Sequence, residues 1–144
     1  ENVAMPLMFL NVSKKERERR AKEILEAVGL GKHMHHKPTQ MSGGQQQRVG
    51  IARAFVNTPK IVFADEPTGN LDSHTTLEVM AIIVDIIRKT GQTLIIVTHD
   101  PSIAHYADRI VHVLDGDIEY IEQNENPIRP EVPELADHPA EVTA

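Results

Sequence analysis

The feature that most constrains the fold is a strand–helix–strand pattern in the middle of the chain. Ile61–Ala64 is a short apolar run, and Thr93–Val97 is a second run, rich in β-branched residues. Both are typical of strands that are buried on both faces of a sheet. Between them, after the capping residue Ser73 and before Gly91, apolar residues recur at helical spacing. These helical positions are Leu77, Met80, Ala81, Val84 and Ile87. Strands joined in this way lie parallel, so the sequence predicts an α/β fold with a parallel sheet.

Four further elements are predicted around this unit. Ser13–Val28 is expected to be a helix capped by Ser13, with Glu16 completing a capping-box pattern. Gln45–Val56 is expected to be a second helix. Asp100-Pro101 starts a short helix, because proline is tolerated at the first helical position. Asp115-Gly116 lies between two apolar runs, which predicts a β-hairpin.

Composition excludes several classes of protein. The 144 residues include no Cys, which rules out a disulfide framework and thiolate metal sites. No apolar run approaches the roughly 20 residues that a membrane-spanning helix needs, and no signal segment opens the chain. We therefore expect a soluble, cytoplasmic chain.

The formal net charge of −6 is unevenly distributed. Residues 13–37 contain eight Lys and Arg against four Glu, and residues 115–144 contain nine acids against one Arg. No aromatic residue interleaves with the basic block, so a solvated helix face is favoured over a nucleic-acid surface. Prolines interrupt the acidic segment. We therefore expect the folded part to end near Ile121 and residues 122–144 to form a flexible acidic tail.

Chemically versatile residues follow both predicted strands. Asp65 and Glu66 come after the first strand, and Thr98 and His99 come after the second. Ligands bind at the carboxyl ends of the strands in parallel sheets. The first acid can hold a hydrated Mg²⁺ and the second can activate water; the alternative is that both acids cap the next turn. For His99, the alternatives are a contact to phosphate and a histidine satisfied within the fold.

A glycine-rich segment, Ser42-Gly43-Gly44, precedes the second predicted helix. Glycines let the backbone approach a ligand closely, and a helix N-terminus offers N–H groups and a positive dipole end to an anion. The alternative is an ordinary N-cap at Ser42 followed by flexible glycines.

A histidine cluster at residues 33–36 presents another choice, between a metal site and an exposed linker. Nearby acids that would complete a metal site are not evident. The linker interpretation is therefore favoured.

These segments coincide in order and spacing with the motifs of one family. Met41–Arg48 resembles the signature motif of ABC-type ATPases, with Met where Leu is commoner. Ile61–Asp65 resembles the Walker B strand, and Glu66 resembles the catalytic glutamate beside it. Gly69–Asp72 resembles the D-loop, and His99 resembles the switch histidine of the H-loop. Four motifs in family order are a specific match. The residue sequence of these motifs is similar to that of one branch of the family, the lipoprotein-release, macrolide-export and cell-division ATPases.

The resemblance implies a P-loop NTPase-like (RecA-like) α/β core, of which this chain holds the second half, together with part of the ABC helical subdomain. It covers residues 1–121. Residues 1–57 would be the helical subdomain with the signature motif, and residues 58–121 would be the core with the Walker B, D-loop and H-loop motifs. The tail, residues 122–144, lies outside the resemblance.

The resemblance also assigns roles at an ATP site. Asp65 would bind Mg²⁺ through water, and Glu66 would be the general base for the water that attacks the γ-phosphate of ATP. His99 would contact that phosphate. Such groups stabilise the charge that develops on the transferred phosphoryl group. ATP and Mg²⁺ are the cofactors that the resemblance implies.

A second set of residues would serve the ATP held by a partner subunit. In the family, the signature residues present hydroxyl and N–H groups across a head-to-tail dimer. By resemblance these residues are Ser42, Gly43, Gly44 and Gln45. Asp72 would couple the two sites across that dimer. Hydrolysis is therefore expected to need a second ATP-binding subunit.

The P-loop pattern Gly-x-x-x-x-Gly-Lys-Ser/Thr does not occur in this sequence. In the family, that loop would precede the segment that begins at Glu1. Without it, the cradle for the β-phosphate is missing. We therefore expect this chain to be the C-terminal part of an ATPase subunit, and to bind ATP weakly and be inactive alone.

The leading hypothesis is an ATP-hydrolysing subunit of a membrane transporter, held at the inner face of the cell membrane by a permease subunit or domain. Glu1–Leu10 and the basic helix are the candidate docking face. One alternative is the ATPase head of a chromosome-maintenance or DNA-repair protein, and another is a partner-binding remnant without turnover. No coiled-coil insertion precedes the signature, which favours the transporter. A nucleic-acid partner is not expected.

Overall fold

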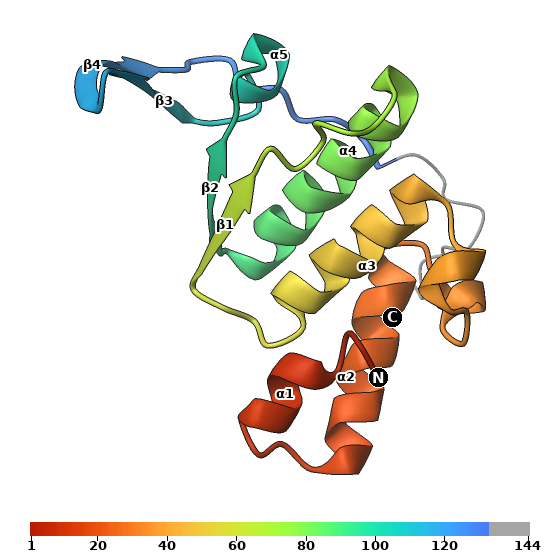
Figure 1. The fold of residues 1–144 in the computed structure, drawn as a ribbon. Coiled ribbons are helices and arrows are strands. Elements are labelled where there is room, and N and C mark those ends of the chain that lie inside the picture. The colour runs from red at the N-terminus through yellow and green to blue at the C-terminus, as the bar shows by residue number, and fades with distance from the viewer. Residues whose placement is uncertain (133–144) are drawn as a thin grey trace.

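The computed structural model describes residues 1–132, so the rest of the predicted acidic tail lies outside the described residues. Figure 1 shows a layer of two paired strands, then α4, then α3, with α1 and α2 beyond. The elements are α1 (Met5–Phe9), α2 (Lys14–Ala27), 3₁₀ turns at Gly31–His33 and Pro38–Gln40, α3 (Gly43–Phe55), β1 (Ile61–Asp65), α4 (Ser73–Thr90), β2 (Thr93–Val97), α5 (Pro101–Ala104), β3 (Arg109–Leu114) and β4 (Asp117–Gln123). Within residues 1–132, no helix has the length and apolar character needed to cross a bilayer.

The predicted parallel strand pair is confirmed, but its two faces differ. In β1 and β2, Asp65 lies opposite Val97 in a parallel register. Val62 is buried toward α4, whereas Phe63 on the other face is 73% exposed. Alternate side chains of a strand point to opposite faces, and α4 covers one of them (Figure 1). The expectation of strands buried on both faces is therefore wrong for the described residues.

Helix α4 is buried around most of its middle rather than along one stripe. Val79–Val84 are each at most 8% exposed, because the helix lies between the strand pair and α3 (Figure 1). Leu77, which the sequence pattern places on the apolar stripe, is 59% exposed. Gly91 ends the helix as predicted, with a left-handed φ of 66° that glycine adopts without strain.

Capping side chains decide where α3 and α4 begin. The carboxylate of Asp72 accepts the N–H of Thr75 at 3.0 Å, so Asp72 rather than Ser73 caps α4. Helix α3 begins at Gly43, two residues before the predicted start, because Ser42 caps it. Sequence patterns place helix ends only to within one or two residues, which accounts for both differences.

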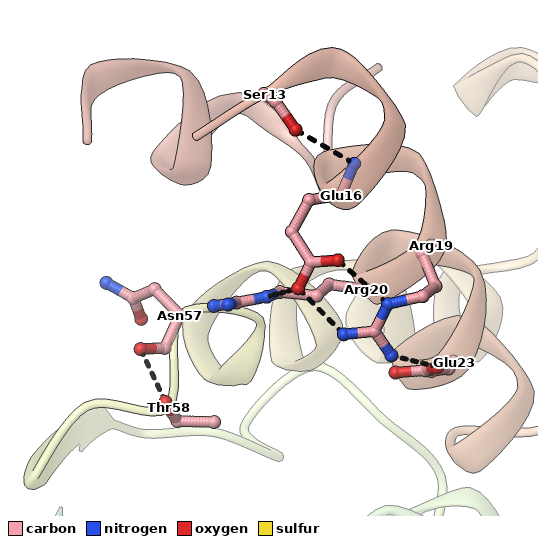
Figure 2. Close-up of polar contacts among 7 residues, drawn as sticks. All are labelled: Ser13, Glu16, Arg19, Arg20, Glu23, Asn57 and Thr58. Carbon is pink, nitrogen blue, oxygen red and sulfur yellow. Dashed lines mark hydrogen bonds and ion pairs between the residues drawn. The ribbon is translucent and has the colours of Figure 1, made fainter. Parts of the chain in front are cut away.

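Helix α2 begins after Ser13 as predicted, but Glu16 does not complete the capping box. The Oγ of Ser13 accepts the N–H of Glu16 at 3.4 Å. The Glu16 carboxylate instead accepts hydrogen bonds from Arg19 at 2.7 and 2.9 Å and from Arg20 at 2.7 Å (Figure 2). These hydrogen bonds lower the pKa of Glu16 to about 2. Part of the basic block is thus an ion-paired helix face.

Strands β3 and β4 form the predicted hairpin. Asp115 and Gly116 have φ values of 50° and 89°, the left-handed geometry that Asp-Gly adopts readily in a two-residue hairpin turn. Strand β4 continues to Gln123. The regular structure therefore extends past Ile121, where the sequence analysis placed the end of the folded part.

The segment after β4 returns to the loop between α5 and β3. The side-chain amide of Asn124 donates to the carbonyl of His105 at 3.0 Å. The guanidinium of Arg129 donates to the carbonyl of Tyr106 at 2.7 Å. This part of the predicted flexible tail is held by hydrogen bonds to backbone carbonyls, which the search for apolar periodicity does not detect.

Candidate functional site

The parallel register brings the two strand ends together, as the sequence predicts. The N–H of Glu66 donates to the carbonyl of Val97 at 2.9 Å, which continues the strand pairing one residue beyond β1. The residues that follow β1 and β2 therefore meet at one edge of the sheet. This edge places Glu66 beside Thr98 and His99.

Glu66 accepts three hydrogen bonds from the segment that follows β2. Its Oε1 lies 2.6 Å from Nδ1 of His99 and accepts the backbone N–H of His99 at 2.9 Å. Its Oε2 accepts the hydroxyl of Thr98 at 3.2 Å. Both carboxylate oxygens are engaged, whereas the side chain of His99 is 88% exposed. The histidine ring is thus open to a ligand while it contacts the carboxylate.

Two opposing effects set the pKa of Glu66. Partial burial raises the pKa, and hydrogen bonds from the side chain and backbone of His99 lower it. The hydrogen bonds prevail, so the pKa of Glu66 lies below its ordinary value of 4.5. The carboxylate is ionised at neutral pH, which is the form that can accept a proton from water.

The backbone of Glu66 is held in an unusual conformation. Its φ of 43° lies in the left-handed region, which is uncommon for residues other than glycine and costs on the order of 1–3 kcal/mol. The carbonyl of Glu66 accepts the N–H of Gly69 at 3.2 Å. Strained backbone of this kind persists where the surrounding structure enforces it, and it occurs often at functional sites.

Asp65 ends β1 with an exposed side chain. Within residues 1–132, no group of three or more His, Cys, Asp or Glu could enclose a metal ion. A single exposed carboxylate suits Mg²⁺, because this ion keeps several waters and takes its remaining oxygens from phosphates. The residues present fit a hydrated Mg²⁺ held by one carboxylate, and they do not form a cage.

A second group of predicted residues lines a cleft of about 390 Å³ between the starts of α3 and α4. Its lining includes the signature residues Ser42, Gly43, Gly44 and Gln45 and the D-loop residues Asn70, Leu71 and Asp72. The D-loop residues are close to the signature residues of the same chain. None of Asp65, Glu66 and His99 lines this cleft.

Ser42 and Gln45 form a reciprocal capping box at the start of α3. The Oγ of Ser42 accepts the N–H of Gln45 at 3.2 Å, and the N–H of Ser42 donates to the side chain of Gln45 at 3.0 Å. The N-cap interpretation of Ser42 is therefore correct as a description of this chain. It does not exclude an anion, because Gly43 and Gly44 occupy the first helical turn, where N–H groups have no intrahelical partner.

Asp72 connects the cleft to α4 through Thr75. Its carboxylate accepts the N–H of Thr75 at 3.0 Å and the Thr75 hydroxyl at 2.7 Å. These hydrogen bonds, with the backbone N–H of Thr75 contributing most, lower the pKa of Asp72. The methyl group of Thr75 lies so close to Gly44 that a β-carbon at position 44 would be 2.6 Å from it. Only glycine fits at position 44 without movement of Thr75.

Three residues to which no sequence pattern assigned a role, Gln47, Arg48 and Glu78, join α3 to the rest of the site. The amide of Gln47 donates to the carbonyl of Pro67, and Arg48 forms an ion pair with Glu78. The signal that could have found them is helical spacing, because Gly44, Gln47 and Arg48 share one face of α3.

His33, from the histidine cluster, packs near the start of α3. Its Nε2 lies 3.4 Å from the side-chain amide nitrogen of Gln45. Its ring meets that of His36 edge to face, with centroids 4.9 Å apart. Through these contacts, His33 packs against the segment that carries the signature residues.

Comparison with known proteins agrees with the motifs. The model of the family described as ABC transporter matches residues 1–69. The lipoprotein-releasing system ATP-binding protein LolD 2 of Caulobacter vibrioides is 50% identical over 119 residues, which are 83% of this chain and 52% of that protein. The macrolide export ATP-binding/permease protein MacB of Syntrophobacter fumaroxidans is 52% identical over 121 residues, 83% of this chain and 17% of MacB. The chain spans about half the length of LolD 2.

Solved structures give the same result. The dimeric structure of MJ0796, a bacterial ABC transporter cassette, matches with a TM-score of 0.74 and 43% identity, over 87% of this chain and 56% of that one. A post-hydrolysis state of the same cassette, bound to ADP and Pi, matches with a TM-score of 0.72 and 42% identity, over 85% of this chain and 55% of that one. These likenesses confirm a P-loop NTPase-like α/β fold. The chain is thus part of an ABC transporter ATP-binding domain, homologous to the LolD and MacB nucleotide-binding subunits.

Proposed function

We propose that the protein containing this sequence is an ATP-hydrolysing subunit that powers a membrane transporter and acts as a head-to-tail dimer. The observation that carries the proposal is the ionised carboxylate of Glu66, held by His99 at the carboxyl ends of two parallel strands. A carboxylate in that position is suited to activate water for phosphoryl transfer. The homology to ATP-binding proteins of lipoprotein-releasing and macrolide export systems supports it.

In this proposal, Glu66 and His99 act in sequence. The exposed ring of His99 turns from Glu66 to the γ-phosphate of ATP, which frees Oε1 of Glu66 for the attacking water. Thr98 and the backbone N–H of His99 still orient the carboxylate. Glu66 then accepts the proton of that water. Asp65 would hold Mg²⁺ through water, and the ion would neutralise charge on the phosphates.

The signature residues Ser42, Gly43, Gly44 and Gln45 serve the ATP of the partner subunit. Their cleft contains a helix N-terminus, which favours negative charge. Asp72 lies in the same cleft and would couple the two ATP sites. A dimer of ATP-binding subunits is supported by the dimeric cassette that this chain resembles.

We assign contact with the membrane to a permease subunit or domain, which would hold this subunit at the cytoplasmic face. The docking face in this assignment is α1 with the adjoining basic helix α2. Phe9 is 81% exposed and Leu10 is 59% exposed, and neighbouring exposed apolar side chains mark interaction surfaces. A nucleic-acid partner is not part of the proposal.

The domain division also belongs to this proposal, with residues 1–57 in the helical subdomain and 58–121 in the core. Because the sequence contains no P-loop pattern, the 144-residue chain should bind ATP weakly and hydrolyse none by itself. Titration calorimetry with ATP tests this expectation. A micromolar dissociation constant would contradict it.

The test of the main proposal is Glu66→Gln in the complete ATP-binding subunit. This change keeps the shape of the side chain and removes the base, so the ATPase rate should fall by at least about a hundredfold. Glu119→Gln, at an exposed position of β4, is the matched control and should leave the rate unchanged. Equal rates for Glu66→Gln and the unsubstituted subunit would defeat the general-base assignment. Rates that are negligible even without substitution would favour a partner-binding remnant.

A further inference from the structure

Helix α3 reaches the segment that carries Glu66 in its own chain. The side-chain amide of Gln47 donates a hydrogen bond to the carbonyl of Pro67, 20 residues away in the sequence. Pro67 directly follows Glu66 and is buried. The helix that begins at the signature residues is thus bonded to the residue beside the carboxylate of the same subunit.

The conformation of Glu66 depends on how its neighbours are held. Its left-handed φ of 43° is disfavoured for a side chain with a β-carbon, so external bonds have to maintain it. The N–H of Glu66 is held by Val97 and its carbonyl by Gly69. The next carbonyl, that of Pro67, is held by Gln47. Gln47 therefore fixes the third backbone group of this turn.

Two neighbours of Gln47 on the same face of α3 make this link stiff. Gly44 packs directly against Thr75 at the start of α4. Arg48 pairs with Glu78, and their side chains are only 13% and 24% exposed. Because these contacts fix the position of α3 on α4, the Gln47 amide has little freedom to follow Pro67 if that segment moves.

We infer that Gln47 is a positioning residue that holds Glu66 in its working conformation, so that each subunit's signature helix sets the geometry of its own general base. The inference rests on the function proposed above. If this is so, one chain connects two ATP sites. Its signature residues contact the ATP of the partner subunit, and its Glu66 acts on the ATP that the chain itself binds. Any shift of α3 when ATP seats on the signature residues would reach Glu66 through Pro67.

The first test measures the link without activity, by hydrogen exchange on the complete subunit in the absence of nucleotide. Gln47→Met removes the donor and keeps the length of the side chain. The amide of Gly69 is hydrogen-bonded to the carbonyl of Glu66. Its exchange rate should rise about fivefold, because the loss of one neutral hydrogen bond changes a local opening equilibrium by about that factor. Exchange in β2 should not change, which excludes general unfolding.

The matched control is Gln46→Met. The amide of Gln46 also donates to backbone carbonyls, those of Pro38 and Met41, both at 3.1 Å, but these belong to the segment before α3 and not to the segment of Glu66. Exchange at Gly69 should be unchanged in this variant. An equal rise in both variants, or no rise in Gln47→Met, would overturn the inference.

The second test separates positioning from a merely structural role. Gln47→Met should lower kcat for ATP about fivefold while KM stays the same. Gln47→Lys, which keeps an N–H donor with sufficient reach, should recover most of the lost kcat. A raised KM, an unchanged kcat, or a lysine variant no better than methionine would refute the positioning role. If Glu66→Gln leaves the ATPase rate intact, the proposed function fails, and the exchange experiment still reports on the link itself.

Discussion

The Oε1 of Glu66 lies 2.6 Å from Nδ1 of His99, so the group proposed to accept a proton from water directly faces the group proposed to contact phosphate. The ring is exposed and the carboxylate is only partly so. One contact therefore joins the two functions. In the proposed mechanism, a phosphate that binds the His99 ring would also free Glu66 to accept the proton.

The first prediction concerns the pH dependence of hydrolysis. Hydrogen bonds from His99 hold the pKa of Glu66 below its ordinary value, against the effect of burial. His99→Ala removes the ring and keeps the backbone bond, so the pKa of Glu66 should rise. Because only the ionised base accepts a proton, and the His99 ring contacts Glu66 in the nucleotide-free enzyme, the acid limb of kcat/KM should move to higher pH. Steady-state ATPase rates of the complete subunit across the acid range check this, and an acid limb at the same pH in both proteins would count against it.

The second prediction concerns the close contact at Gly44. A β-carbon there would lie 2.6 Å from Cγ2 of Thr75, and the hydroxyl of Thr75 is tied to Asp72. Gly44→Ala should therefore lower the free energy of unfolding by about 1–3 kcal/mol, the usual cost of overpacking. Urea unfolding of the complete subunit provides the measurement.

Two further variants isolate the cause of that loss. Thr75→Ser removes the methyl group but keeps the hydroxyl, so combining it with Gly44→Ala should restore most of the stability. Gly43→Ala should cost little, because a β-carbon at Gly43 meets nothing within 4 Å. A loss at Gly43 as large as that at Gly44 would show that backbone freedom, not the contact with Thr75, is what matters.

The third prediction concerns acid stability. Hydrogen bonds from Arg19 and Arg20 lower the pKa of Glu16 from 4.5 to about 2 (Figure 2). A carboxylate with a depressed pKa stabilises the folded state above its unfolded pKa and loses that contribution as pH falls through the folded value. Glu16→Gln should therefore destabilise the protein at neutral pH, with a difference that shrinks between about pH 4.5 and about pH 2.

Thermal unfolding as a function of pH measures this effect. Glu18→Gln on the same helix is the control, because Glu18 pairs with Lys14 at 3.8 Å and both side chains are largely exposed. Its effect on stability should be small at every pH. A stability difference for Glu16→Gln that persists unchanged to pH 2 would contradict the ion-pair explanation.

The fourth prediction tests the action of the signature residues across the dimer. In the proposed head-to-tail dimer, Glu66→Gln in one subunit would leave a single working base, which would face the signature residues of the substituted subunit. Adding Ser42→Ala to that same subunit should lower the remaining ATPase rate. Adding it to the other subunit should lower the rate much less, although the loss of the α3 cap is the same in both. The opposite ranking would mean that Ser42 serves its own chain.

The sequence predicted those parts of the fold whose signals are local. The β1–α4–β2 unit follows from two apolar runs and a helical period, and the hairpin follows from Asp115-Gly116. The meeting of Glu66 and His99 follows from the parallel strands. Their roles in hydrolysis stay predictions.

The features that escaped prediction depend on contacts between distant segments. Asp72 and Ser73 are both good caps, and only the geometry with Thr75 selects Asp72. The return of Arg129 to the carbonyl of Tyr106 joins residues 23 apart and leaves no periodic signal. In the sequence, nothing distinguishes Gln47 from the two glutamines before it. Its partner is the backbone carbonyl of Pro67, and only the fold brings the two together.

The left-handed backbone at Glu66 has a consequence for protein engineering. Glycine, or asparagine to a lesser degree, relaxes at such a φ. Replacing Glu66 by either relieves this strain and loses the hydrogen bonds from Thr98 and His99, so where the strain outweighs those bonds the melting temperature should rise while turnover is abolished. A selection for thermostability alone would then drift toward inactive proteins at this position. The stability–activity trade-off would be concentrated at one residue, and a screen that counts surviving folded protein would reward the loss of the base.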